Sequence, residues 1–157
     1  MKKQYLLLLS VIVLIIVGVI LYYQFFMPVA EEKWYLELAV NGKTVKKYGL
    51  SELKGKAITI TVTKSKYGQT QEIKIKAVPV KQLLLENNID LSKITKIKCT
   101  ASDGYSKELD ASVLDELYVW VVDEKDVADN GPLRIVHPKL SSKYWVKFLV
   151  QIDVSTG

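Results

Sequence analysis

Gly131-Pro132-Leu133-Arg134-Ile135-Val136-His137-Pro138 and, after five intervening residues, Tyr144-Trp145-Val146-Lys147-Phe148 are the two stretches that decide the fold. Asp129 and Asn130 precede the first stretch, and a run of Asp, Asn, Gly and Pro is typical of a turn. The apolar residues that follow predict a strand over 133–137, and the second stretch predicts a strand over 144–154. A turn, a strand, a short loop and a closing strand are therefore expected here.

Outward from these stretches, short β-branched or aromatic runs alternate with turns. Asn41-Gly42 is the strongest short signal for a type I′ hairpin, and Tyr67-Gly68 predicts a second hairpin. A helix is predicted over 79–88, where proline suits the first turn and the leucines share one face. Shorter helices are predicted near 52–54 and 111–116. The remaining strands are predicted over 34–40, 44–48, 57–63, 71–77, 93–101, 105–109 and 118–122.

The order of these elements predicts the fold class. Only the helix at 79–88 is long enough to act as a crossover, which disfavours a repeating βαβ parallel sheet. We therefore expect a β-rich α+β domain with a mixed sheet over residues 34–157.

An apolar segment precedes this domain. Leu6 to Phe26 contains 21 residues, and all but Ser10, Gly18 and Gln24 are hydrophobic. As a helix it would span roughly 31 Å at about 1.5 Å per residue, close to the hydrocarbon thickness of a bilayer. The segment therefore predicts one transmembrane helix, which would contact membrane lipid.

The flanking charges predict its orientation. Lys2 and Lys3 precede the apolar run, so the positive-inside rule places the N-terminus in the cytoplasm. We expect residues 1–27 to be a signal anchor, residues 28–33 a linker, and residues 34–157 a domain on the outer face of the cell membrane. A cleaved signal peptide is the alternative. It is disfavoured by the length of the apolar run and by the poor small-x-small site, of which Pro28-Val29-Ala30 is the nearest candidate.

The charge pattern bears on partners. Twenty of the 22 basic residues and all 17 acidic residues follow the apolar run, so the net charge of that part is only +3. Its lysines alternate with other residues, as on the solvent face of strands. No concentrated basic patch with aromatic platforms is present, so nucleic-acid binding is not expected.

Single cysteine and histidine residues limit the chemistry. Cys99 is the only cysteine, so no internal disulfide forms, and one cysteine with one histidine cannot supply a structural zinc site. Cys99 is in phase with Ile97 and Ala101, which predicts a buried structural thiol. His137 is expected to be a hydrogen-bonded or edge histidine, and the spacing suggests no catalytic triad.

Four ordered motifs resemble a known family. They are Val78-Pro79-Val80-Lys81-Gln82-Leu83-Leu84, Lys98-Cys99-Thr100-Ala101-Ser102-Asp103-Gly104-Tyr105-Ser106, Gly131-Pro132-Leu133-Arg134 and Trp145-Val146-Lys147. Together they are similar to the oxidoreductase molybdopterin-binding domain of the sulfite oxidase family. The resemblance covers roughly 34–154 and implies a mixed-sheet α+β domain of that type. It also implies a molybdopterin cofactor whose metal is held by a cysteine.

The chain departs from the family at that cysteine. The corresponding stretch, residues 59–68, contains none, and a hydroxyl or a lysine is a poor substitute for a thiolate on a soft, high-valent metal. Cys99 lies on a later strand. No catalytic residue and no metal ligand is therefore predicted.

A second departure lies where the family's basic residues contact the anionic pterin. Arg134 and Lys147 match the family pattern, but Asp129 stands at the position of its histidine and would repel a phosphate. Arg134 and Lys147 could still form a small anion site. The alternative is that both are strand residues paired with local carboxylates such as Asp123 or Asp153.

Asp103 and Tyr105 complete the candidate binding residues. Asp103 suits a general acid or a metal ligand, but Asp-Gly is also ordinary turn chemistry. Tyr105, Tyr144 and Trp145 are expected at the same rim, where exposed aromatic side chains would suit a protein partner.

The predicted function follows from the retained scaffold and the missing ligands. We expect a membrane-anchored extracytoplasmic domain that acts as a non-catalytic ligand-binding or protein-interaction module, without cofactor. One alternative is a molybdopterin-dependent oxidoreductase or redox-complex subunit whose site is atypical or completed by a partner chain. Another is a structural subunit of a membrane complex, which has little support because Gly18 alone gives no small-xxx-small motif.

Overall fold

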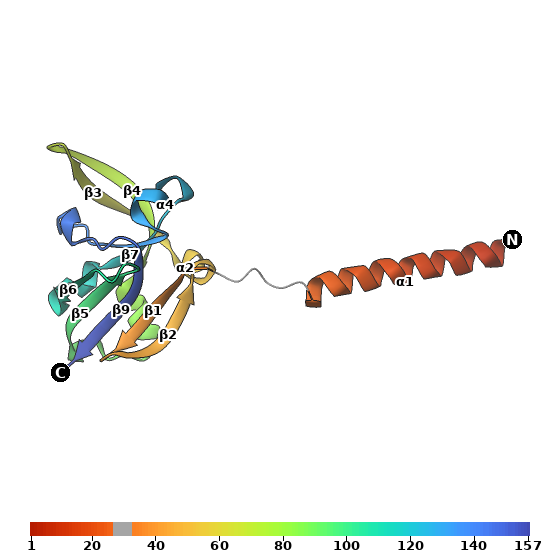
Figure 1. Cartoon of the computed structure of the whole chain (residues 1–157), viewed down its shortest axis with the longest axis horizontal. Coiled ribbons are helices and arrows are strands. Elements are labelled where there is room, and N and C mark those ends of the chain that lie inside the picture. Colours follow the sequence, from red (N-terminus) through yellow and green to blue (C-terminus); the bar gives the residue numbers. More distant parts are fainter. Residues whose placement is uncertain (27–32) are drawn as a thin grey trace. The chain divides into compact units, whose positions relative to one another are not determined.

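The computed structural model describes residues 1–26 and 33–157, which fall into two units, Met1–Glu31 and Glu32–Gly157. The first unit is the helix α1 (Lys2–Phe26), which has no buried residue (Figure 1). Among the described residues, α1 is the only helix long and apolar enough to cross a membrane, and a signal sequence meets the same criterion. Residues 28–32 of the predicted linker lie outside the described residues.

The larger sheet of the second unit has the order β2-β1-β9-β5-β6. Parallel pairing joins β1 to β9, and the other neighbours are antiparallel, so the sheet is mixed as predicted. Asn41 and Gly42 join β1 to β2 with φ of 50° and 83°, which confirms the type I′ turn. The strands are β1 (Tyr35–Val40), β2 (Lys43–Gly49), β5 (Ile94–Ala101), β6 (Ser106–Asp110) and β9 (Leu149–Thr156).

The smaller sheet has the order β3-β4-β7-β8 and is antiparallel throughout. Its strands are β3 (Ile58–Lys66), β4 (Gln69–Pro79), β7 (Tyr118–Val121) and β8 (Leu133–Val136). Tyr67 and Gly68 join β3 to β4 with φ of 54° and 76°, as the predicted hairpin requires. Because β4 meets β7 only at residues 77–79, the rest of β3 and β4 forms a two-stranded ribbon that extends beyond the body of the domain (Figure 1).

Short helices connect the strands. The α-helices are α2 (Leu50–Lys56), α3 (Val80–Glu86) and α4 (Val127–Asn130). The 3₁₀ helices are η1 (Leu91–Lys93), η2 (Ala111–Glu116), η3 (Glu124–Asp126) and η4 (Ser142–Tyr144). α3 is shorter than predicted at both ends: Pro79 still belongs to β4, where it pairs with Tyr118, and the helix ends before Asn87, its C-cap, and Asn88, which has a positive φ of 58°.

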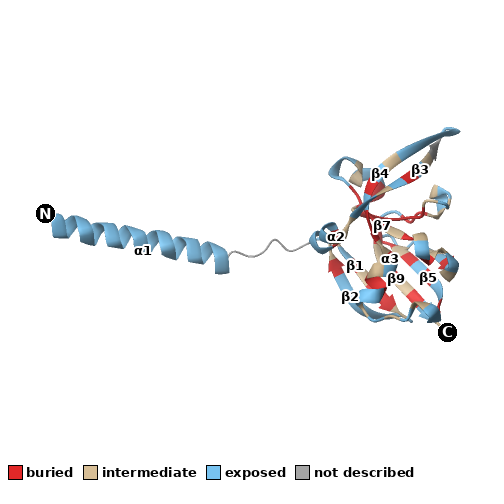
Figure 2. Cartoon of the chain, turned by 180° about the vertical axis from the view of Figure 1, so that it is seen from behind, coloured by how far each residue is buried: buried red, intermediate tan, exposed pale blue. Residues whose placement is uncertain are grey.

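The core has two parts, drawn in red in Figure 2. The main cluster takes residues from both sheets and from α3, including Leu38, Ile97 and Ile135. The second cluster lies on the opposite face of the smaller sheet. Trp120 of β7 belongs to it, while the neighbouring Val119 and Val121 belong to the main cluster, as the alternation of a strand requires.

The predicted closing strand over 144–154 is wrong in its first part. Residues 145–148 are irregular, and the strand begins at Leu149. Val146 accepts a hydrogen bond from the Ile135 N–H at 2.9 Å, so this segment runs beside the smaller sheet before β9 enters the larger one. Phe148 makes the change of direction with a positive φ of 53°. His137, predicted in a strand, lies just beyond the end of β8.

Candidate anion-binding site

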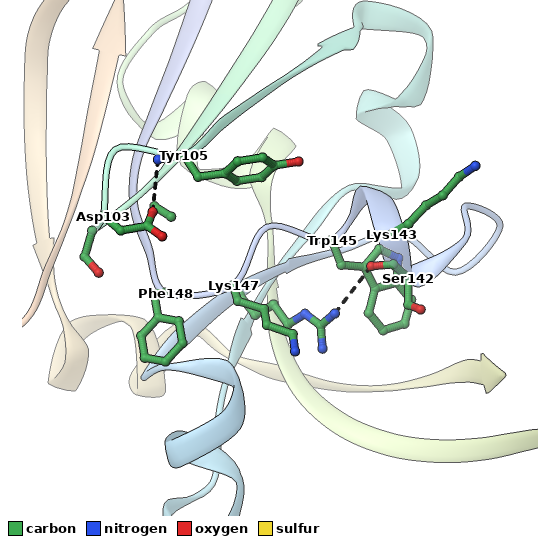
Figure 3. Close-up of a pocket in the computed structure, with 10 residues that line it drawn as sticks. Asp103, Tyr105, Ser142, Lys143, Trp145, Lys147 and Phe148 are labelled. Carbon is green, nitrogen blue, oxygen red and sulfur yellow. Dashed lines mark hydrogen bonds between the residues drawn. The ribbon is translucent and has the colours of Figure 1, made fainter. Parts of the chain in front are cut away.

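A pocket of about 610 Å³ opens where three segments meet (Figure 3). The turn after β5 supplies Asp103 and Tyr105, β8 supplies Arg134, and the irregular segment before β9 supplies Lys147. The four binding residues predicted from sequence therefore line one pocket, although they are far apart in the chain. The other lining residues are Ala101, Ser102, Ser142, Lys143, Trp145 and Phe148.

Arg134 is the most unusual of these residues because its guanidinium is buried without a counter-charge. The residue is 3 % exposed. Its Nη1 donates to Asn130 Oδ1 at 2.7 Å and its Nη2 to the Ser142 carbonyl at 3.4 Å, but its Nε has no partner. Burial lowers the pKa of Arg134 to about 10. The site thus contains a desolvated cation with one unused donor, an arrangement that costs free energy in the absence of a counter-charge.

The predicted alternative, pairing of Arg134 or Lys147 with a local carboxylate, does not occur among the described residues. Asp153 instead accepts a hydrogen bond from the Gly42 N–H at 3.1 Å. Asp123 is exposed at the start of η3. Asp129, expected to repel a phosphate, is exposed on α4 and does not line the pocket. Asp129 therefore repels an anion bound in the pocket less than its position in the sequence suggested.

Trp145 forms the wall of the pocket beside Arg134. The guanidinium carbon lies 5.2 Å from the centre of the Trp145 ring, within the range of a cation–π interaction. The indole Nε1 donates to the carbonyl oxygens of His137 and Leu140, both at 3.2 Å. The ring is therefore fixed by the loop that follows β8.

Phe148 connects α4 to the turn that follows β5. Its N–H donates to the Asn130 carbonyl and its carbonyl accepts from the Ser102 N–H, both at 2.9 Å. Gly131, with φ of 74°, lies so close that a Cβ there would be 2.7 Å from Phe148 Cα. Only glycine fits this approach, which explains the Gly-Pro turn before β8.

Asp103 both shapes the turn and faces the pocket. Its Oδ1 accepts from the Tyr105 N–H at 2.9 Å, and the Gly104 N–H donates to the Ala101 carbonyl at 3.0 Å. The interpretation of Ser-Asp-Gly as a turn is thus confirmed. Figure 3 shows the Asp103 carboxylate on the side of the pocket where Phe148 lies.

The charge of the pocket favours an anion. Lys143, Lys147 and Arg134 outnumber the single carboxylate of Asp103, so the lining carries a net charge of +2. No sequence pattern identified Lys143, Ser142 or Asn130 as site residues. Two short helices, η4 for the first two and α4 for Asn130, bring them to the site. Asn130 stands four residues before Arg134, and its side chain, which orients the guanidinium, is the signal that was missed.

The described residues do not fit a molybdenum–thiolate centre. Cys99 is fully buried in the main cluster, does not line the pocket, and has a thiol pKa raised to about 12 by burial. Within residues 1–26 and 33–157, no group of three or more His, Cys, Asp or Glu side chains is placed to hold a metal. Arg134 and Lys147, by contrast, fit an anionic group such as a phosphate.

Comparison with known proteins gives information about the fold alone. No protein-family model and no curated protein matches the chain. The crystal structure of the sulfane dehydrogenase SoxCD from Paracoccus pantotrophus is similar, with a TM-score of 0.61 and 12 % identity over 82 % of this chain. The chain spans 40 % of the length of that protein. The likeness shows that residues 33–157 share the fold of part of that protein, an α+β domain with a mixed sheet, and the apolar helix α1 precedes this domain in the chain.

Proposed function

We propose that this protein is a membrane-anchored, non-catalytic module that binds a small anion in the pocket around Arg134. The observation that carries the proposal is the buried guanidinium, which has a free Nε and no carboxylate partner among the described residues. An uncompensated buried charge is costly, and a bound anion would offset that cost.

The arrangement of the pocket supports a ligand with an anionic end and an apolar part. Arg134 and Lys147 would hold the anionic end, with the guanidinium giving directed hydrogen bonds and the ammonium a point charge. The Trp145 and Phe148 rings provide apolar walls. Asp103 and Tyr105 at the other rim would contact the rest of the ligand.

The proposed location rests on α1. Its length and composition support a single-pass anchor with the N-terminus in the cytoplasm and the domain on the outer face, and membrane lipid would be its first partner. A further protein partner in the membrane or outside it would meet the exposed rim of the pocket, where Tyr105 is 54 % exposed.

The second candidate is a molybdopterin-dependent oxidoreductase or redox subunit whose site is completed by another chain. The fold likeness to a sulfane dehydrogenase favours it, and Arg134 and Lys147 would hold the cofactor's phosphate. The metal would then need its thiolate from the partner. Stoichiometric molybdenum in protein from a molybdenum-replete host would support this candidate and contradict a non-catalytic role.

Calorimetric titration of the detergent-solubilised full chain with inorganic phosphate tests the main proposal. Arg134→Met should weaken phosphate binding by about ten- to a hundredfold, the range expected for a charge-assisted hydrogen bond of about 1.5–3 kcal/mol. Lys147→Met should weaken it less, because that ammonium is exposed.

Lys98→Met is the matched control, since it removes the same charge from an exposed position on β5 outside the pocket. Wild-type protein that binds no phosphate would contradict the proposal. So would a Lys98→Met variant that loses as much affinity as Arg134→Met, because the effect would then reflect net charge alone.

A further inference from the structure

The β3–β4 ribbon has a free backbone edge. β3 is the terminal strand of its sheet and pairs only with β4, from Ile58 opposite Ala77 to Lys66 opposite Gln69. Beyond residues 77–79 of β4 the ribbon has no third strand, and Figures 1 and 2 both show it extending from the domain. The base of the ribbon packs into the second cluster through Val62 and Ile75, and a third strand along its free edge would stabilise it further.

The edge lacks the features with which proteins usually prevent strand addition. Residues 58–63 are Ile-Thr-Ile-Thr-Val-Thr, all β-branched, without charge or proline. The register with β4 is regular over its whole length, so no bulge turns the edge away. Natural edge strands are normally protected by lysines, prolines or bulges. In the sequence of β3, lysines stand only at the far end, at positions 64 and 66.

We propose that β3 is the contact between two copies of this chain, which pair antiparallel along it with Thr61 of each copy on the two-fold axis. This register places Ile60 opposite Val62 of the second copy and Thr59 opposite Thr63. Ile60 and Val62, whose face packs against the second cluster of each copy, then continue one apolar face across the pair, and hydroxyls line the other face. A strand that matches itself in this way is what a two-fold symmetric interface requires.

The charges of the ribbon allow this register. Lys64 would lie opposite Ile58 of the second copy, along which its aliphatic stem can pack, so no two lysines face each other. The ribbon still has a net charge of +3, from Lys64, Lys66, Lys74 and Lys76 against Glu72. The copies therefore repel one another at long range, and added salt should strengthen the pairing by screening that repulsion.

The interface is small, which suits two copies held in one membrane. Pairing of residues 58–64 buries much less than the roughly 1,200 Å² of a standard interface, so the contact is weak in dilute solution. The anchor of the proposed function confines the copies to a plane and raises their effective concentration. To that extent this inference rests on the proposed function.

Cysteine cross-linking of the full chain in native membranes tests the pairing. Across an antiparallel pair, directly opposed Cα atoms lie about 4.5–5.5 Å apart, within disulfide range. Thr61→Cys should therefore give a disulfide-linked dimer on mild oxidation. Thr59→Cys alone and Thr63→Cys alone should not, because each pair of equivalent residues would lie about 13 Å apart at about 3.3 Å per residue. Co-expressed Thr59→Cys and Thr63→Cys chains should link to each other.

Thr61→Lys, added to the co-expressed pair, should reduce that cross-link at least tenfold by placing like charges on the axis. Thr61 is exposed, so the variant should keep wild-type thermal stability and phosphate binding. Equal cross-linking at positions 59, 61 and 63 would indicate random collision and overturn the proposal. A cross-link from Thr61→Cys to a protein of different mass would also overturn it, because another chain would then cover the edge. Phosphate titration of the same variants separates either failure from a failure of the anion site.

Discussion

The Arg134 guanidinium carbon lies 5.2 Å from the centre of the Trp145 ring, so the buried cation rests against an aromatic wall that is itself fixed by two hydrogen bonds. The contact joins β8 to the irregular segment before β9. Replacing Trp145 should therefore change both the stability of the domain and the orientation of the cation.

Trp145→Phe and Trp145→Leu separate these two effects. Trp145→Phe keeps a ring beside Arg134 but removes the indole N–H, and should lower the free energy of unfolding by about 1–2 kcal/mol. Trp145→Leu also removes the ring, and should weaken phosphate binding by a further three- to tenfold, as expected for a partly desolvated cation–π contact of about 1 kcal/mol. Urea unfolding and phosphate titration measure the two quantities. Equal phosphate affinities in the two variants would show that the ring does not support the cation.

Gly131→Ala should destabilise the domain by at least about 2 kcal/mol. The added Cβ would lie 2.7 Å from the Phe148 Cα, a backbone atom, at a φ of 74° and ψ of 173° that side chains avoid. Gly55→Ala is the control, because nothing lies within 4 Å of that position in α2 and alanine favours a helix. Urea unfolding should show a loss for the first variant and no loss for the second. A neutral Gly131→Ala would mean that Phe148 can move.

His137 should make the domain less stable in mild acid. Burial is the main cause that lowers the pKa of His137, with Glu116 opposing it and Lys139 adding to it. The imidazole Nδ1 accepts the Lys139 N–H at 3.1 Å, which only the deprotonated nitrogen can do. As the pH falls, the unfolded chain, whose histidine pKa is about 6.5, therefore binds a proton at this side chain before the folded chain does.

The sign of the effect follows from these pKa values. Stability is fully present above the unfolded pKa of about 6.5 and is lost as the pH falls from there through the lowered pKa of the folded state. Unfolding free energies between pH 7.5 and 5.5 should decrease for the wild type and decrease less for His137→Gln. An equal slope in both proteins would assign the pH dependence to other groups.

Cys99 should be unreactive in the folded domain. Its thiol is fully buried and its pKa is raised to about 12, so almost no thiolate exists at neutral pH. A maleimide should label the wild type only in denaturant, while Ser155→Cys, at an exposed position of β9, should react in the folded state. Rapid labelling of Cys99 in the native protein would show that the strand opens, and would reopen the question of a metal role.

The local signals of the sequence predicted the hairpins and the buried strand positions well. Asn41-Gly42 and Tyr67-Gly68 have the positive φ values that two-residue turns need. Ile97, Cys99 and Ala101 are all buried on one side of β5, as their alternation indicated. These features depend on near neighbours in the chain, and short-range patterns therefore determine them.

The segment before β9 could not be predicted in the same way. Trp145-Val146-Lys147 has the composition of a strand, but the chain must pass here from one sheet to the other. The positive φ of Phe148, a residue type that seldom adopts it, is imposed by the contact with Gly131. The burial of Arg134 beside Asn130 also depends on how the chain passes from one sheet to the other. The sequence therefore indicated a cation at this position, but not that the cation has no carboxylate partner.

The position of β9 has a consequence for biosynthesis. β9 lies between β1 and β5, so the larger sheet is divided until residues 149–156 have been made. As the chain leaves the ribosome, β1 can pair with β2 at once. Its other neighbour, β9, is made only more than a hundred residues later. Protection of that unpaired edge would therefore be needed until nearly all of the domain has been synthesised.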